Sequence, residues 1–154
     1  MERIEQTILR NLVFNEDYAR KVIPFIQPTY FEQRTEKIIF QEIVHFIVKY
    51  GSSITIEALN IEVENRTDLT ESEIKETREI CNSLNDSPVD HQWLLDSTEK
   101  WCRDRAIYLA LMESISIADG QDDKQNRDAI PSILSDALSV SFDNNIGHDY
   151  LENF

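Results

Sequence analysis

The chain has 154 residues and a strongly acidic composition, with 15 basic and 29 acidic residues and a formal net charge of −14. Its hydrophobic content of 41% is sufficient for a core, so length and composition predict one folded domain and argue against disorder. This charge repels nucleic-acid phosphates and anionic membranes unless the basic residues gather on one face, and they are not gathered in the sequence.

The N-terminus, MERIEQTILR, carries charges within its first three residues and lacks the apolar core of a signal peptide. No apolar run approaches the roughly 18 residues that are needed to cross a bilayer. We therefore expect a cytoplasmic protein that has no membrane contact and binds little nucleic acid directly.

The first part of the chain is predicted to form two short helices. Apolar residues recur at helical spacing over residues 2–14, and Asn15 offers a cap for a second helix that runs to about Ile26. Pro24 and Pro28 then break the helical pattern.

The segment from Thr35 to Tyr50 has the widest apolar surface. Apolar residues cover more than half of its helical circumference, so we expect a buried helix at the centre of a globular head. Gly51 is expected to end it, because glycine readily adopts the left-handed conformation that stops a helix.

Two further helices complete the predicted head, which we assign to residues 1–89. Residues 56–65 suit a short amphipathic helix, and Thr70 with Glu73 forms a capping-box pattern at the start of a helix that runs to about Asn85. No segment alternates apolar and polar residues over a length that would indicate a strand. The predicted fold class is all-α.

A long helical hairpin is predicted for residues 90–142. The stretch from Asp90 to Ala118 contains no Pro or Gly, and its apolar residues recur at steps of three, four and seven. Asp90 is a plausible N-cap, and the helix would be roughly 40 Å long. A second periodic segment runs from Asp128 to Ser141, after a polar turn that begins near Gly120.

Nucleotide-binding motifs are absent from the chain. With only Gly51, Gly120 and Gly147 present, neither a Walker-type phosphate loop nor a G-x-G-x-x-G fingerprint can be written. We expect no catalytic, cofactor-binding or metal-binding residues.

Two arrangements resemble metal sites. Glu42 and His45 have the spacing of a di-iron motif, but that site needs a second copy, so a solvated Glu42 and a His45 at the rim of the core are the simpler interpretation. An acidic cluster looks loosely like a calcium loop, although Lys124 and Ile130 stand where that loop needs Gly and Glu. The cluster comprises Asp119, Asp122, Asp123 and Asp128.

Other side chains with potential chemistry have simpler interpretations. His91 lies beside Asp90, but no nucleophile or oxyanion-type turn accompanies it. Trp93, Trp101 and Tyr108 could stack bases, although such platforms lie in basic grooves, so core or interface positions are favoured.

The two cysteines, Cys81 and Cys102, show no metal-binding spacing. They fall within two predicted helices. We expect reduced thiols rather than a disulfide.

Three runs of the sequence show a family resemblance: KVIPFIQPTYF, SPVDHQWLLDSTEKWCRDRAIYLAL and AIPSILSDALSVSFDNNIGHDYLENF. They resemble the N-terminal region of the DnaB-family replicative DNA helicases of T4-like bacteriophages, and the resemblance covers essentially the whole chain. It implies a hexameric helicase whose N-terminal domains pair through helical hairpins and dock primase. It also implies that ATP and Mg²⁺ are bound by a downstream motor domain, and that residues 143–154 begin the linker towards it.

From the resemblance we expect a role in DNA replication in the cytoplasm of an infected bacterium, with primase, a helicase loader and further copies of the chain as partners. The hairpin has more apolar surface than two thin helices can hide, so we expect it to be the protein interface. The expected interface residues are Trp101, Tyr108, Leu111, Met112, Ile115, Ile130, Ile133, Leu134 and Leu138.

The alternative is a stand-alone acidic adaptor or inhibitor that mimics the charge of DNA. A charge mimic needs acidic faces and has no use for a long aromatic and aliphatic stripe, so the helicase interpretation is favoured.

Overall fold

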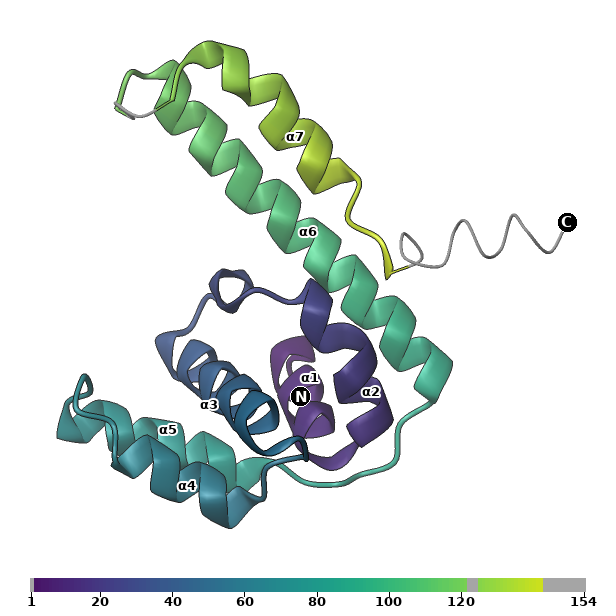
Figure 1. The fold of residues 1–154 in the computed structure, drawn as a ribbon, viewed down its shortest axis with the longest axis vertical. Helices are drawn as coiled ribbons and strands as arrows, with labels where there is room; N and C mark the ends of the chain where they lie inside the picture. The colour runs from purple at the N-terminus through teal and green to yellow at the C-terminus, as the bar shows by residue number, and fades with distance from the viewer. Residues whose placement is uncertain (1, 122–124, 143–154) are drawn as a thin grey trace, which may run out of the picture. The chain divides into compact units, whose positions relative to one another are not determined.

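The computed structural model describes residues 2–121 and 125–142, and this part of the chain contains seven α-helices, three short 3-10 helices and no strand (Figure 1). The all-α prediction is confirmed. The chain divides into two compact units, one up to Leu95 and one from Asp96 onward. The boundary expected from the sequence, between residues 89 and 90, lies directly before the long helix α6 (His91–Ala118), whose first residues belong to the first unit and whose remaining residues belong to the second.

Three helices form the core of the first unit: α1 (Ile4–Phe14), α2 (Glu16–Val22) and α3 (Arg34–Tyr50). The Asn15 side chain caps α2 as expected, because its Oδ1 accepts from the backbone N–H of Tyr18 at 3.1 Å. Two 3-10 turns, Ile23–Phe25 and Pro28–Tyr30, connect α2 to α3 where the prolines prevent a continuous helix. The fully buried side chains include Ile8, Leu9, Leu12, Tyr18, Phe31, Ile39 and Ile43.

The helices α4 (Ile56–Glu64) and α5 (Glu71–Ser83) pack against each other and against α3 (Figure 1). The predicted capping box is confirmed: the Thr70 Oγ1 accepts from the Glu73 N–H at 3.1 Å, and a Glu73 carboxylate oxygen accepts from the Thr70 N–H at 2.9 Å. Thr55 caps α4 in the same way, through the N–H of Ala58.

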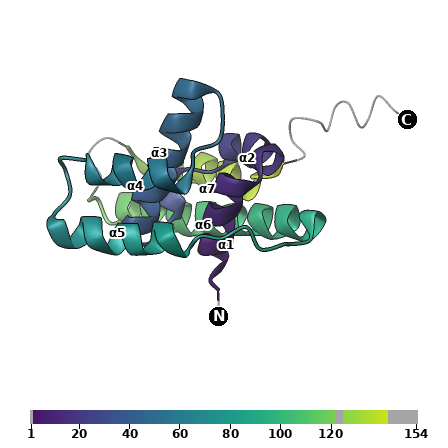
Figure 2. The same ribbon diagram turned by 90° about the horizontal axis from the view of Figure 1, so that it is seen from below.

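The end of α3 differs from the prediction. Gly51 ends the helix with a φ of 72°, as expected, but only the first half of α3 is buried on its apolar face. The Val48 side chain is 78% exposed, and His45 is exposed rather than packed at the rim of the core. Figure 2 shows that the last turns of α3 extend past the other helices of this unit, so neighbours cover them only in part, and Phe46 and Ile47 are half-buried.

A buried carboxylate joins α1 to α3. The Glu36 side chain is fully buried, and Arg3 Nη1 donates to its Oε2 at 2.6 Å. Burial raises the pKa of the Glu36 carboxyl, and the Arg3 guanidinium offsets this only in part. The other carboxylate oxygen, Oε1, has no hydrogen-bond partner among the described residues.

The long helix α6 (His91–Ala118) begins where the sequence predicts, because the Asp90 Oδ1 accepts from the N–H of Trp93 at 3.0 Å. It has 28 residues and is therefore roughly 42 Å long. No helix in the described ranges combines the length and hydropathy required to cross a membrane.

The second arm of the predicted hairpin is present but shorter than expected. Its α-helix α7 covers Ile130–Leu138 rather than residues 128–141, after a 3-10 turn at Arg127–Ala129. Figure 1 shows α7 alongside the C-terminal half of α6. Three residues of the turn, 122–124, and the expected linker, 143–154, lie outside the described residues.

Two side chains of α6 explain why α7 ends early. Arg103 Nε donates to the Val140 carbonyl at 3.0 Å, and the Phe142 N–H donates to Glu99 Oε2 at 2.7 Å. These bonds hold Val140 and Phe142 beside α6, and they pair backbone groups that a longer α7 would pair within the helix.

Candidate protein interface on the hairpin

The C-terminal half of α6 has two apolar faces. Its buried face consists of Ala106, Ala110, Ser114 and Ile117, which are spaced three or four residues apart. Because α7 lies alongside this half of α6 (Figure 1), it can cover that face. The small side chains at three of these positions allow two helices to approach closely.

The other apolar face of α6 is exposed. Its four large side chains, between 47% and 53% exposed, form a continuous row that we call the outer stripe; they are Tyr108, Leu111, Met112 and Ile115. At about 100° of rotation per residue, the centre of the outer stripe lies roughly 155° from the centre of the buried face. A single partner helix cannot cover both faces, so α7 leaves the outer stripe accessible.

The remaining predicted interface residues have different environments. Trp101 is only 7% exposed, so its ring is not available to a partner in this conformation. Ile130, Ile133 and Leu134 on α7 are half-buried, whereas Leu138 is exposed. The structure thus gathers four of the nine predicted residues on one accessible helix face.

Charged side chains border the outer stripe. The Arg105 guanidinium lies 4.9 Å from the centre of the Tyr108 ring, a cation–π contact that orients the tyrosine. Lys100 and Asp104 form an exposed ion pair at 2.6 Å, one turn before the stripe begins. An apolar row with a charged border is typical of protein interfaces, which combine a dry centre with a polar rim.

The hairpin is closed at both ends by polar contacts. Near the turn, Arg127 Nη2 donates to the Ala118 carbonyl at 3.2 Å, and Gln125 Nε2 donates to Glu113 Oε1 at 3.2 Å. At the open end, Glu99 and Arg103 bind residues 140–142. Sequence reasoning missed this second set, because the i, i+4 pair of Glu99 and Arg103 cannot be told apart in the sequence from the exposed i, i+4 pair of Lys100 and Asp104.

The side chains considered for metal binding are placed differently. Glu42 is largely buried rather than solvated, since its side chain is 12% exposed and accepts from Arg66 Nη1 at 3.0 Å, whereas the exposed His45 lies about one turn further along the same face of α3. Within the described ranges, no group of three or more His, Cys, Asp or Glu side chains is arranged to hold a metal ion. Asp122 and Asp123 of the calcium-loop hypothesis lie outside those ranges.

The aromatic and sulfur side chains also have defined environments. Trp93 and Tyr108 are half exposed but Trp101 is buried, so the three rings do not form one open stacking surface. Cys81 and Cys102 are both free and fully buried, and burial raises the pKa of each thiol to about 12. Both thiols are therefore protonated core groups with low reactivity.

The sequence of the chain was compared with those of known proteins and protein families. No protein-family profile matches the chain. The chain is 36% identical over 157 aligned residues to a DnaB-like replicative helicase of Enterobacteria phage T4. The match covers 97% of this chain and 33% of the helicase, so the chain spans about a third of the length of that relative. The resemblance described from the sequence is thereby confirmed: nearly the whole chain is similar to one part of a phage replicative helicase.

Proposed function

We propose that this chain acts in phage DNA replication as the N-terminal interaction domain of a replicative DNA helicase, where it joins copies of the helicase and docks primase. The similarity to a DnaB-like replicative helicase supports a role in DNA replication, and the outer stripe of α6 supports a role in protein interaction. The observation that carries the proposal is the accessibility of four large apolar side chains on one face of a well-formed helix.

The expected partner for the outer stripe is the same stripe on a second copy. Residues at i, i+3, i+4 and i+7 form a narrow seam, and two such seams pack against each other across a two-fold axis. Each half-exposed stripe offers on the order of 300 Å² of apolar surface. Burying two of them contributes roughly 15 kcal/mol at about 25 cal/mol per Å².

Association has a cost that offsets much of this gain. The loss of translational and rotational freedom alone costs about 4–15 kcal/mol. The isolated chain should therefore self-associate in a concentration-dependent manner rather than form an inseparable dimer. In a complete helicase ring, tethering to a motor domain would raise the effective concentration of the stripes.

In this proposal, ATP hydrolysis and DNA unwinding are carried out by the part of the helicase that the match does not cover. ATP and Mg²⁺ would bind there, and the present chain would not hydrolyse ATP. Primase and a helicase loader are the proposed partners in the infected cell. A net charge of −14 favours contacts with proteins over direct contact with DNA. The acidic-adaptor alternative gives no role to the outer stripe.

Sedimentation equilibrium tests the proposal. Met112→Asp combined with Ile115→Asp places two charges in the outer stripe, where both wild-type side chains are half exposed. Ser132→Asp combined with Ser135→Asp is the matched control, because it adds the same charge at exposed positions of α7. The proposal predicts loss of association only in the first variant. Equal association of both variants would place the interface elsewhere.

A further inference from the structure

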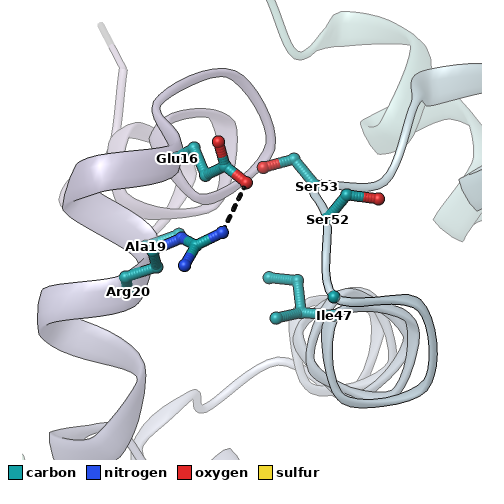
Figure 3. A pocket seen from close by; sticks show the side chains of 7 residues that line it. Glu16, Ala19, Arg20, Ile47, Ser52 and Ser53 are labelled. Atoms are coloured by element: carbon teal, nitrogen blue, oxygen red, sulfur yellow. Dashed lines mark hydrogen bonds and ion pairs between the residues drawn. The ribbon is translucent and has the colours of Figure 1, made fainter.

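A small pocket opens between α2 and the C-terminal end of α3, in the first unit (Figure 3). Its volume is about 140 Å³, and Ala19, Ile47 and Gly51 are among the residues that line it. Figure 3 shows Glu16, Ala19 and Arg20 on one side and Ile47, Ser52 and Ser53 on the other, with the open space between Arg20 and Ile47. We call this space the docking pocket.

The docking pocket has the size of one side chain. Sites for cofactors and other small molecules usually occupy about 300–1,000 Å³, whereas a cavity of about 150 Å³ holds a single benzene-sized group. An aliphatic or aromatic side chain from another protein therefore fits this space better than a free ligand does.

A polar atom near the docking pocket lacks a partner. Ser53 Oγ is buried and makes no hydrogen bond to any of the described residues. A buried hydroxyl without a partner is uncommon and costs free energy, because it has lost its hydrogen bonds to water. Because this atom is buried, a peptide bound in the pocket would reach it only after the Ser53 side chain had changed its rotamer.

A second recess lies on the other side of Glu16, and we call it the acidic recess. Glu16 and Asp17 line it together with Asp86, Phe14 and Val89, and no basic side chain contributes to its lining. Glu16 is paired with Arg20 at 3.0 Å, but Asp17 and Asp86 form no ion pair with any described residue. Because two unpaired carboxylates lie next to an apolar pocket, charge complementarity favours a positively charged occupant.

We propose that the docking pocket and the acidic recess together bind a basic segment of a partner protein, which inserts one apolar side chain into the pocket and one Lys or Arg into the recess. Glu16 is shared by both cavities, so one short segment can reach the two sites. Nucleic acid is disfavoured as the occupant because its phosphates would face these carboxylates. The proposal does not rest on association through the outer stripe, and its test has a separate readout.

Binding to an array of short synthetic peptides tests the proposal. Each peptide carries one Leu or Phe and one Arg at a varied spacing on a neutral background, and companion peptides replace Arg by Glu or the apolar residue by Ser. The labelled wild-type chain should bind a subset of the peptides that carry both residues. Either replacement should weaken binding by at least about tenfold.

Variants of the chain assign the binding to this surface. Asp17→Asn combined with Asp86→Asn removes the two unpaired charges at exposed positions, and Ala19→Leu fills the docking pocket. Each should weaken binding by at least about tenfold. If Ala19→Leu fails to fold, the Asp17 and Asp86 variant still decides the question.

Glu57→Gln combined with Glu79→Gln is the control, because it removes the same charge from exposed positions of α4 and α5. It should bind the peptides as the wild type does. The proposal is wrong if no peptide binds in a manner that requires both residues. It is equally wrong if binding follows peptide charge alone and weakens as much in the control as in the Asp17 and Asp86 variant.

Discussion

The buried pair of Arg3 and Glu36 predicts opposite outcomes for its two partners. The Glu36 side chain is fully buried, whereas the Arg3 side chain is 38% exposed. Arg3→Ala leaves a buried carboxylate without its cation, and such a change costs about 3–5 kcal/mol of unfolding free energy near neutral pH. Glu36→Gln leaves an arginine that water can solvate, so we expect a cost of only about 1 kcal/mol.

The pH dependence of these variants is set by the raised pKa of Glu36. A carboxyl whose pKa is higher in the folded state favours folding when it is neutral. This contribution is complete below the ordinary Glu value of 4.5 and is lost as the pH rises through the folded pKa. Removing Arg3 takes away a group that lowers this pKa, so the deficit of Arg3→Ala relative to wild type should shrink as the pH falls towards 4.5.

Urea unfolding followed by circular dichroism at several pH values measures both effects. Arg20→Ala is the control, because its exposed ion pair with Glu16 is worth only about 0.3–0.5 kcal/mol. A cost of Arg3→Ala no larger than that of Glu36→Gln would refute the assignment of an uncompensated buried charge. A deficit that is the same at every pH would refute it as well.

Three further predictions concern a helix cap, the thiols and nucleic acid. Thr70→Ala removes the hydroxyl that accepts from the Glu73 N–H, and it should lower the unfolding free energy by about 1 kcal/mol in the same urea assay; an unchanged midpoint would show that the cap contributes nothing. Cys81 and Cys102 should react with a thiol reagent only after unfolding, since burial raises their pKa to about 12, and rapid labelling of the native protein would contradict their placement. A fluorescent single-stranded oligonucleotide should bind weakly near physiological salt, because the net charge is −14; tight, steeply salt-dependent binding would instead indicate a basic or stacking surface.

Features with local causes could be predicted from the sequence. The caps at Asn15, Thr70 and Asp90 depend on residues within three positions of each side chain, and all three were confirmed. The stop at Gly51 likewise depends on one backbone angle. For the same reason, helix order and the all-α class can be read from periodicity alone.

Features that depend on distant neighbours could not be predicted. The last turns of α3 are apolar enough to be buried, but whether they are covered depends on the lengths of other helices. The early end of α7 depends on Glu99 and Arg103, about forty positions away along the chain. The burial of Trp101 and the exposure of Met112 could not be predicted either. Periodicity identifies both residues as apolar, and only tertiary packing decides which of them is buried.

The outer stripe of α6 is, in our proposal, the surface through which two copies meet. Single cysteines at each of its four positions test this directly, because a disulfide requires Cα atoms to lie within about 7 Å of each other. The native thiols are buried and protonated, so they should not interfere. Ser132→Cys and Ser135→Cys on α7 are exposed controls.

Under mild oxidation, at least one stripe cysteine should form an intermolecular disulfide much faster than either control cysteine does. Equal rates at stripe and control positions would contradict the claim that the outer stripe is the self-association surface.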